Sequence, residues 1–345
     1  MGPAPQGDAL ARFANENNLD HNILLGQPYA SSFSCEGFST DRYIIEAGGL
    51  QHCDASPRLS HCITGIRLTS FKRFANSLLQ LTHACMVGRS LGVKRLHIPG
   101  FWYLREGIHS SSNGLEIRNT DQPDLGADEL VLAGSFLKMK ALKPLCRRRV
   151  NPRRMLRSLR PLINLDLNAT VDQKDNLVIH IRSGDIFITP HPHYGQPPLA
   201  FYQKVVRSKP WNMVRVVFED RLNPVITPLL DWLPHHCGRV EVVSGSLKDD
   251  LEVLLRARAI ACGRGTFIRG ISALSRNLKK VYHWHDESFD TWGNRKLKVF
   301  RVVDGTGTYA KAICQGNWQN TAEQQQLMVT YPEEGLSIQR PLPRA

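Results

Sequence analysis

The sequence contains no apolar run near the ~18 residues that a membrane-spanning helix needs. Its opening residues, MGPAPQGDAL, lack the basic start and the apolar stretch of a signal peptide. We therefore expect no transmembrane segment in this chain, and the compartment has to be judged from other features.

Signature motifs of several common enzyme classes are absent as well. There is no GxxxxGK[ST] loop, no HExxH and no GxSxG, which argues against P-loop NTPases, zinc metalloproteases and hydrolases with a nucleophile elbow. The segment GTGTYA at 305–310 lacks the third glycine of a dinucleotide fingerprint. His191 with His193, and His283 with His285, supply two imidazoles per segment, whereas a zinc site takes three or four ligands. We expect no bound metal.

Cysteine spacing gives no zinc or redox motif. The eight cysteines form no CxxC pair. Cys85 lies in a helical pattern and Cys262 in a strand-like one, so both are expected to be buried free thiols. Three cysteines near the N-terminus leave room for a disulfide, and Asn168-Ala169-Thr170 is a glycosylation sequon. Together these features give a slight preference to the lumen of the Golgi or ER over the cytoplasm.

Acidic residues are scarce relative to basic ones, 31 against 44, and the net charge is +13. The excess is concentrated between Lys143 and Arg160, where eight basic residues and no acidic one occur. This segment is either a patch for nucleic acid or acidic polysaccharide, or a solvated face beside the site of an anionic ligand. No aromatic residue is interleaved there to stack on bases, so we expect no nucleic-acid partner.

A chain of 345 residues predicts two domains. Residues 1–60 show little periodicity and are interpreted as an irregular lead-in. We expect an acceptor-side Rossmann-like domain over 61–165 and a donor-binding Rossmann-like domain over 166–300. A partly helical segment at 301–345 completes the chain.

The second half alternates strand and helix patterns five times. The expected strands are 177–182, 214–219, 240–245, 259–263 and 280–284. Short connections between such elements require parallel strands joined by right-handed crossovers, and fully apolar strands fit a sheet covered on both faces. The fold class is therefore α/β with a doubly wound sheet. The first half has a shorter version of this pattern, including a helix over 73–91.

Polar residues follow each of the first four expected strands of the second half. They are Arg182–Asp185, Glu219-Asp220, Asp249-Asp250 and Gly263–Thr266. Ligands of open parallel sheets bind beyond the carboxyl ends of the strands, so we expect these residues to meet in one crevice.

The residue types in this crevice suit a nucleoside diphosphate. Gly265 and Thr266 open a helix, whose free N–H groups and dipole attract an anion. Arg182 offers forked donors for a phosphate oxygen, and the Asp250 carboxylate can accept from two nitrogens of a base such as guanine.

Structural interpretations compete with these roles. Asp249 or Asp250, and likewise Thr266, can be a helix N-cap without any ligand. Arg182 can pair with Asp185, and His180 can be a satisfied core histidine. The conjunction of all these residues on one edge favours a ligand site.

At these residues the chain resembles a known superfamily. HIRSGD, residues 180–185, resembles the H-x-R-R-x-D motif of the GT-B fucosyltransferases, the group of α1,2-, α1,6- and protein O-fucosyltransferases. GQPPLAFYQKVV at 195–206 and DLEVLLRARAIACGRGTF at 250–267 are similar to later parts of that family. KRFANSLLQLTHA at 72–84 is similar to its G-R-F-G-N-Q loop and helix. The matches span much of residues 64–284.

The resemblance implies two Rossmann-like domains facing a cleft and an inverting glycosyltransferase. Fucose would pass from GDP-fucose, the co-substrate, to a hydroxyl of a glycan or protein acceptor, without a metal or another cofactor. The catalytic residues implied are Arg182, which would hold the β-phosphate as it departs, and Asp185. The general base stays open among Asp185, His191 and His193.

The resemblance also implies a set of donor-binding residues in both domains. These are His180, Asp250, Gly265, Thr266, Phe267, Arg73 and Asn76. Ser183 departs from the motif's second arginine, and Ala75 departs from the loop glycine. These departures leave open another donor sugar or a weakened enzyme. Two further alternatives are a glycosyltransferase with a different nucleotide sugar and a non-catalytic basic domain that binds polyanions.

Overall fold

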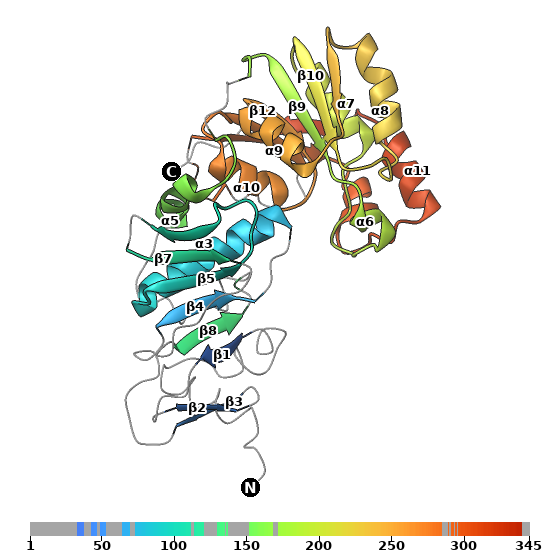
Figure 1. Cartoon of the computed structure of the whole chain (residues 1–345). Coiled ribbons are helices and arrows are strands. Elements are labelled where there is room, and N and C mark those ends of the chain that lie inside the picture. The colour runs from blue at the N-terminus through green and yellow to red at the C-terminus, as the bar shows by residue number, and fades with distance from the viewer. Residues whose placement is uncertain are drawn as a thin grey trace. The chain divides into compact units, whose positions relative to one another are not determined.

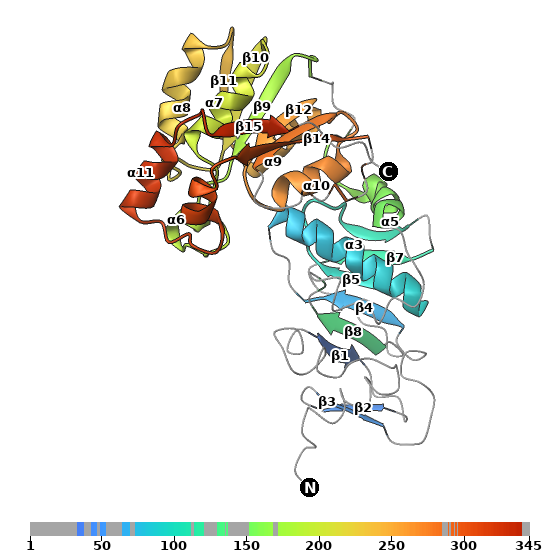
Figure 2. The ribbon, with the colours of Figure 1, turned by 180° about the vertical axis from the view of Figure 1, so that it is seen from behind.

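The structure is a computed structural model of the whole chain, shown in Figures 1 and 2. It describes residues 33–37, 43–46, 49–52, 64–69, 73–111, 114–120, 130–134, 136, 152–167, 172–284, 289, 291–292, 294 and 296–339. In the first three of these segments only the strands themselves are described. The chain divides into a first unit, Met1–Leu165, and a second unit, Asp166–Ala345, which are treated separately below.

The first unit is built on a six-stranded sheet with the order β1-β8-β4-β5-β7-β6. The strands are β1 Phe33–Gly37, β4 Gly65–Leu68, β5 Arg95–Pro99, β6 Gly107–Ser110, β7 Glu116–Thr120 and β8 Leu130–Gly134, and a separate hairpin joins β2 Tyr43–Glu46 to β3 Gly49–His52. Strands β8, β4, β5 and β7 are parallel, whereas the edge strands β1 and β6 run antiparallel to their neighbours.

One long helix, α3 Phe74–Leu91, connects β4 to β5. It ends at Gly92, which adopts the left-handed conformation and donates its N–H to Gly88. Two buried polar side chains on α3 hold the segment after β8: the backbone N–H of Phe136 donates to Gln80 Oε1 at 3.3 Å, and His83 Nδ1 donates to the Phe136 carbonyl at 2.8 Å. Helix α3 therefore covers the sheet and also fixes the exit of β8. A short helix, α5 Pro152–Leu159, and the 3₁₀ turn η4 Arg160–Leu162 follow in this unit.

The second unit has a seven-stranded sheet with the order β11-β10-β9-β12-β13-β14-β15. The strands are β9 Asn176–Ile181, β10 Met213–Phe218, β11 Val240–Val243, β12 Ala259–Cys262, β13 Lys280–Trp284, β14 Lys298–Asp304 and β15 Leu336–Gln339. The first six are parallel and β15 is antiparallel. Numbered along the chain, the parallel strands have the order 3-2-1-4-5-6, which is the doubly wound arrangement of dinucleotide-binding domains.

Helices cover this sheet on both sides (Figures 1 and 2). The elements are α6 Asp185–Ile188, α7 Leu199–Arg207, α8 Ile226–Trp232, η5 Leu233–His235, α9 Leu247–Arg256, α10 Phe267–Leu274, the π-helix η6 Ala310–Cys314 and α11 Ala322–Thr330. Successive right-handed crossovers run first towards β11 and then back across β9, so α7 and α8 lie on one face while α9 and α10 lie on the other. The fold class expected from the sequence, α/β with a largely parallel, Rossmann-like sheet in each half, is confirmed.

The apolar strands supply the core of the second unit. Ile179 and Ile181 of β9 are essentially inaccessible and pack with Val216 of β10 under α7 and α8. Each such side chain contributes roughly 1.5–3 kcal/mol by leaving water. Alternation along a strand sends His180 to the other face, on the side of α9 and α10. The His180 imidazole therefore lies outside this core although its strand is buried.

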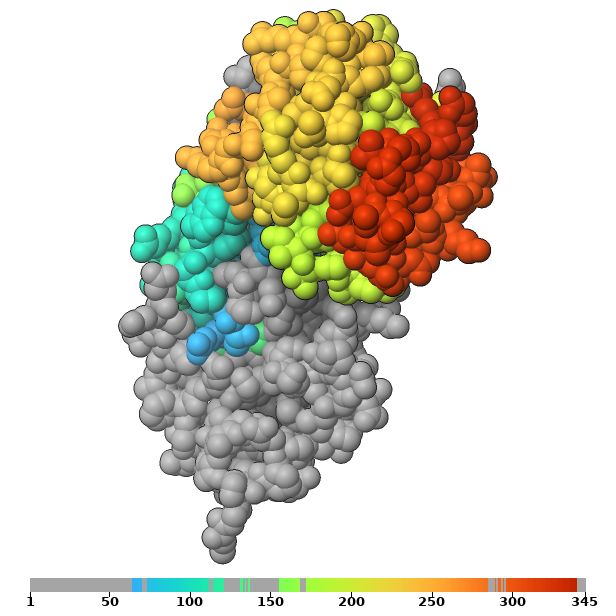
Figure 3. All heavy atoms as spheres, turned by 90° about the vertical axis from the view of Figure 1, so that its right-hand side faces the viewer, coloured from blue at the N-terminus to red at the C-terminus, as the bar shows by residue number. Residues whose placement is uncertain are grey.

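The expected boundary at residue 300 does not separate two bodies. β14 pairs with β13, β15 pairs with β14, and the buried Tyr309 and Trp318 belong to the core of the second unit. Figure 3 shows the red C-terminal residues lying directly against the yellow-green part of this unit. The residues of β14 are mostly half-exposed, so the apolar pattern of this strand is weak. Its place in the sheet is fixed by pairing with β13 and β15. Likewise, β1 of the expected lead-in joins the first sheet.

The GTGTYA segment forms a turn around Asp304 and is no nucleotide loop. The Asp304 carboxylate accepts from the backbone N–H of Thr306 at 3.0 Å, from that of Tyr309 at 2.9 Å and from the Tyr331 hydroxyl at 2.7 Å. These bonds tie the turn to the end of α11. Within the described part of the chain, no helix is long and apolar enough to cross a membrane.

Candidate functional site

The carboxyl ends of β9 and β12 meet at the point where the strand order of the second unit reverses, and ligands of doubly wound sheets bind at such a point. His180, near the end of β9, pairs in register with Cys262 of β12. Its ring lies 5.0 Å from that of Phe267, the first residue of α10. Burial, together with the positive charge of Arg182, lowers the pKa of His180 to about 3. The imidazole is therefore neutral at physiological pH and cannot act there as a cation.

Arg182 follows β9 and is held by carboxylates. Its guanidinium forms an ion pair with Asp185, and its Nη1 lies 4.0 Å from Oε2 of Glu219. The structural pairing with Asp185 that the sequence suggested as an alternative is therefore present. Only 20% of the Arg182 side chain is exposed, whereas about half of Asp185 is. A phosphate that binds Arg182 has to compete with Asp185 for the guanidinium.

Ser183, at the position of the motif's second arginine, is fully buried and structural. Its hydroxyl donates to Asp220, and it accepts from the backbone N–H of Asn223 at 3.0 Å. The Asn223 amide in turn donates to the carbonyl of Arg182 at 2.9 Å. These bonds fasten the loop after β9 to the loop after β10. An arginine at 183 would place a charge in this buried junction, which is costly, so a small hydroxyl side chain suits the position.

Gly184 is required by backbone conformation and by space. Its φ of 69° and ψ of −130° are strained for any residue with a side chain, and a Cβ there would lie 2.7 Å from Oε2 of Glu219. We expect Gly184→Ala to lower the free energy of unfolding by about 1–3 kcal/mol in urea titrations. Gly238→Ala is the matched control, because its Cβ would meet nothing closer than 3.5 Å. If Gly184→Ala lowers the free energy of unfolding no more than Gly238→Ala does, position 184 does not require glycine.

Asp250 lies in the first turn of α9 and is not a helix cap. Ser246 is the N-cap, and Asp249 completes the capping box by accepting from the Ser246 N–H at 2.9 Å. Asp250 itself is 8% exposed, and its Oδ1 has no hydrogen-bond partner among the described residues. Burial, followed by the charges of Asp249 and Glu219, raises the pKa of Asp250 to about 7. A buried acceptor of this kind is unusual unless a ligand completes it.

The turn before α10 presents backbone at the same edge of the sheet. Gly265 has a φ of 143°, a conformation that favours glycine. Thr266 precedes α10, but its side chain makes no capping hydrogen bond to this helix. Thr266 therefore occupies the N-cap position, as the structural interpretation expected, but its hydroxyl does not cap the helix. The side chain of Phe267 is half-buried against His180.

The second unit thus gathers most of the candidate residues at one edge. His180 meets Phe267 directly, Nη1 of Arg182 lies 4.0 Å from Oε2 of Glu219, and the charge of Glu219 contributes to the raised pKa of Asp250. Glu219 follows β10, and the sequence marked it only as one of the polar residues of this edge. Its position beside Arg182 depends on the pairing of β10 with β9.

Arg73 and Asn76 belong to the first unit. Arg73 is the exposed residue just before α3, and Asn76 is partly exposed in the first turn of that helix. Both follow β4, at the carboxyl edge of the first sheet. Ala75, where the resemblance had suggested a glycine, is 2% exposed inside α3, and alanine is favoured over glycine in a helix by about 1 kcal/mol. The Ala75 departure is therefore consistent with an ordinary helix start.

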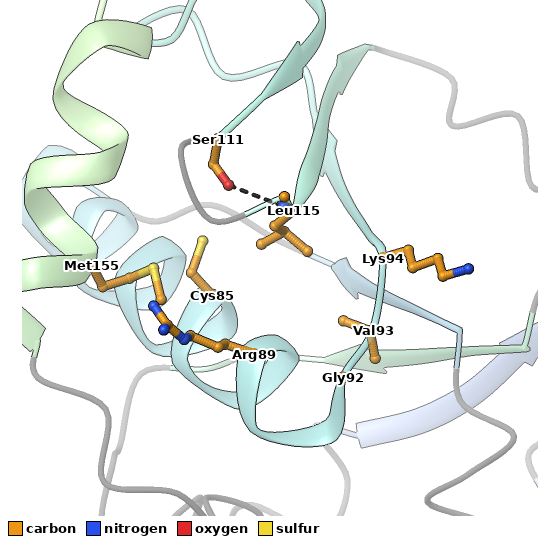
Figure 4. Close-up of a pocket in the computed structure, with 9 residues that line it drawn as sticks. Cys85, Arg89, Gly92, Val93, Lys94, Ser111, Leu115 and Met155 are labelled. Carbon is orange, nitrogen blue, oxygen red and sulfur yellow. Dashed lines mark hydrogen bonds between the residues drawn. The ribbon is translucent and has the colours of Figure 1, made fainter.

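A cavity of about 230 Å³ in the first unit is a different feature (Figure 4). It lies between the end of α3 and the starts of β5 and β7, beside Cys85, Arg89, Lys94, Leu115 and Met155. These are the amino ends of parallel strands, whereas ligands of such sheets bind at the carboxyl ends. The cavity is therefore not part of the candidate site.

The structure also bears on the cysteines and on possible metal ligands. Cys85 and Cys262 are buried free thiols, as expected. No group of three or more His, Cys, Asp or Glu side chains suited to a metal occurs among the described residues. The N-terminal cysteines, the sequon at 168–170, His285 and most of the basic segment 143–160 lie outside the described residues or have undescribed side chains.

Comparison with known proteins identifies no family for this chain. No protein-family profile matches it, and no curated protein does. Among solved structures, the crystal structure of POFUT1 in complex with GDP is similar, with 11% identity and a TM-score of 0.36. The alignment covers 65% of this chain and 98% of that chain. At so low a TM-score, the likeness supports no conclusion about the activity of this chain.

Proposed function

We propose that this chain is an inverting glycosyltransferase that takes a nucleoside-diphosphate sugar, with GDP-fucose as the first candidate donor. The observation that carries the proposal is the set of groups at the strand-order reversal of the second unit. A guanidinium, a neutral imidazole beside an aromatic ring, a helix start and a buried carboxylate with an unpartnered oxygen lie at one edge. This combination suits a pyrophosphate joined to a purine nucleoside.

In the proposed reaction, the glycosidic C–O bond of the donor breaks and negative charge grows on the β-phosphate. Arg182 and the N–H groups at the start of α10 stabilise that charge most strongly in the transition state, which is the interaction that accelerates a reaction. With these groups in place the proposed transfer proceeds without a metal. The acceptor is a hydroxyl of a glycan or protein, and Asp185, His191 or His193 removes its proton. Asp185 is the candidate that already contacts Arg182.

Asp250 accepts hydrogen bonds from the base in this proposal. Two adjacent N–H groups, such as those of guanine, match the two oxygens of a carboxylate. Uracil and cytosine lack this pair of donors, so Asp250 favours GDP over UDP or CMP. The neutral His180 and the ring of Phe267 provide a nearby surface for the nucleoside.

A thermal-shift panel with GDP, UDP, ADP and CMP, and with their sugars, tests the proposal. We expect GDP and GDP-fucose to raise the unfolding temperature, because a ligand that binds only the folded state stabilises it. Stabilisation by UDP alone would indicate a different donor. No response to any nucleotide, together with salt-dependent retention on heparin, would replace the proposal with a polyanion-binding domain.

Binding of GDP is expected to depend on pH through Asp250. Its pKa is raised to about 7, and only the ionised carboxylate accepts from both base nitrogens. GDP should therefore bind about tenfold more weakly at pH 6 than at pH 8, since ionisation falls in that interval. Calorimetric titrations of the wild type measure this difference. Asp250→Asn should bind GDP weakly at both values, and a wild-type affinity that is flat with pH would contradict the role of Asp250.

A further inference from the structure

Glu219 occupies a defined place in the topology of the second unit. It is the residue immediately after β10, and β10 pairs with β9 along its whole length. In the strand order 3-2-1-4-5-6, β9 is the first strand and β10 the second. An acidic residue after the second strand of such a sheet is well placed to accept a hydrogen bond from a ribose 2′-hydroxyl.

The surroundings of Glu219 place its carboxylate within the candidate site. Oε2 lies 4.0 Å from Nη1 of Arg182, and the missing side chain of Gly184 leaves room for the carboxylate. On the other side, the charge of Glu219 acts on Asp250 and contributes to its raised pKa. The Glu219 side chain is 54% exposed, so a ligand can reach it.

A nucleotide has a fixed order of parts, because the ribose joins the base to the pyrophosphate. With the base at Asp250 and the phosphates at Arg182, a carboxylate that lies 4.0 Å from Arg182 at the end of the second strand is placed to meet the ribose. We infer that Glu219 accepts a hydrogen bond from the ribose 2′-hydroxyl of the donor and makes the site selective for ribonucleotides. This inference rests on the proposed function and adds a specificity residue to it.

The cluster of carboxylates alone would not indicate a ligand. The independent observation is Asp250, which is more than nine-tenths buried and whose Oδ1 has no partner within the described residues. The competing role for Glu219 is to hold Arg182 in place. That role affects ribose and deoxyribose nucleotides equally, so the preference between them separates the two roles.

The test compares GDP with 2′-deoxy-GDP by calorimetric titration of the full chain. The wild type should bind GDP about tenfold or more tightly, since hydrogen bonds to charged groups are the strong ones. Glu219→Ala should bind the two nucleotides about equally, whatever the change in overall affinity. Glu252→Ala is the control, because Glu252 lies on α9 and pairs with Arg256 at 3.6 Å. It should keep the wild-type preference.

The outcomes distinguish the two levels of the proposal. A wild type that binds both nucleotides equally, or a Glu219→Ala variant that keeps the preference, overturns the role of Glu219 and leaves the proposed function standing. A wild type that binds neither nucleotide overturns the proposed function, and the role of Glu219 falls with it.

Discussion

Replacing Arg182 with alanine is expected to reduce sugar transfer from the nucleotide donor by about 10²–10³-fold. The reason is that a fixed guanidinium stabilises the negative charge that grows on the leaving phosphate in the transition state. Turnover of GDP-fucose, followed by release of GDP, measures the effect. The expected loss lies mainly in kcat, because the charge develops during the reaction.

Two companion variants make this result interpretable. Arg182→Lys keeps a positive charge but loses the forked geometry, so it should recover only part of the activity. Asp185→Asn removes the carboxylate that now pairs with Arg182, so GDP should bind more tightly. If Asp185 is also the general base, turnover of this variant falls while its affinity for GDP rises. Near-normal turnover of a folded Arg182→Ala protein would remove Arg182 from the mechanism.

Replacing Trp318 with alanine is expected to lower the free energy of unfolding of the second unit by about 3–5 kcal/mol. Trp318 is 1% exposed, its ring lies 5.4 Å from that of Phe187, and its Nε1 donates to the carbonyl of Ile186 at 3.1 Å. The substitution leaves a cavity and an unsatisfied carbonyl. Urea unfolding followed by circular dichroism measures the loss.

The control for this prediction is Trp102→Ala in the first unit. Trp102 is 52% exposed, so its removal should change stability by less than about 1 kcal/mol. Equal effects of the two substitutions would mean that the C-terminal segment does not contribute to the core. Trp318→Ala should also loosen the position of Asp185 in the candidate site, because Trp318 contacts Ile186 and Phe187 of α6, and this helix begins at Asp185.

Local pattern predicted the elements of the second unit well. β9 to β13 begin and end within a few residues of the expected strands, and helices occur between them as expected. Parallel strands buried on both faces produce continuous apolar runs, and the helices between them have a clear 3.6-residue pattern. β14 and β15 were not expected, because the half-exposed strand β14 and the edge strand β15 show only weak apolar alternation.

Only part of the candidate site could be predicted from the sequence. Arg182, Asp250 and Thr266 stood out because each follows a strand or begins a helix at the same edge, whereas Phe267 was implied only by the family resemblance. From the sequence, Ser183 was interpreted as the loss of a positive charge, whereas in the structure its buried hydroxyl donates a hydrogen bond to Asp220. That role depends on β10 lying beside β9, a contact between residues 37 positions apart.

The sequence by itself determined the alternation of strands and helices, the α/β class and the polar residues at the strand ends, since these depend on local periodicity and residue type. Only the tertiary structure decided that β9 lies between β10 and β12, that Arg182 pairs with Asp185, and that Glu219 lies 4.0 Å from Arg182. Strand order follows from packing between distant segments, and local pattern carries little information about which strands become neighbours.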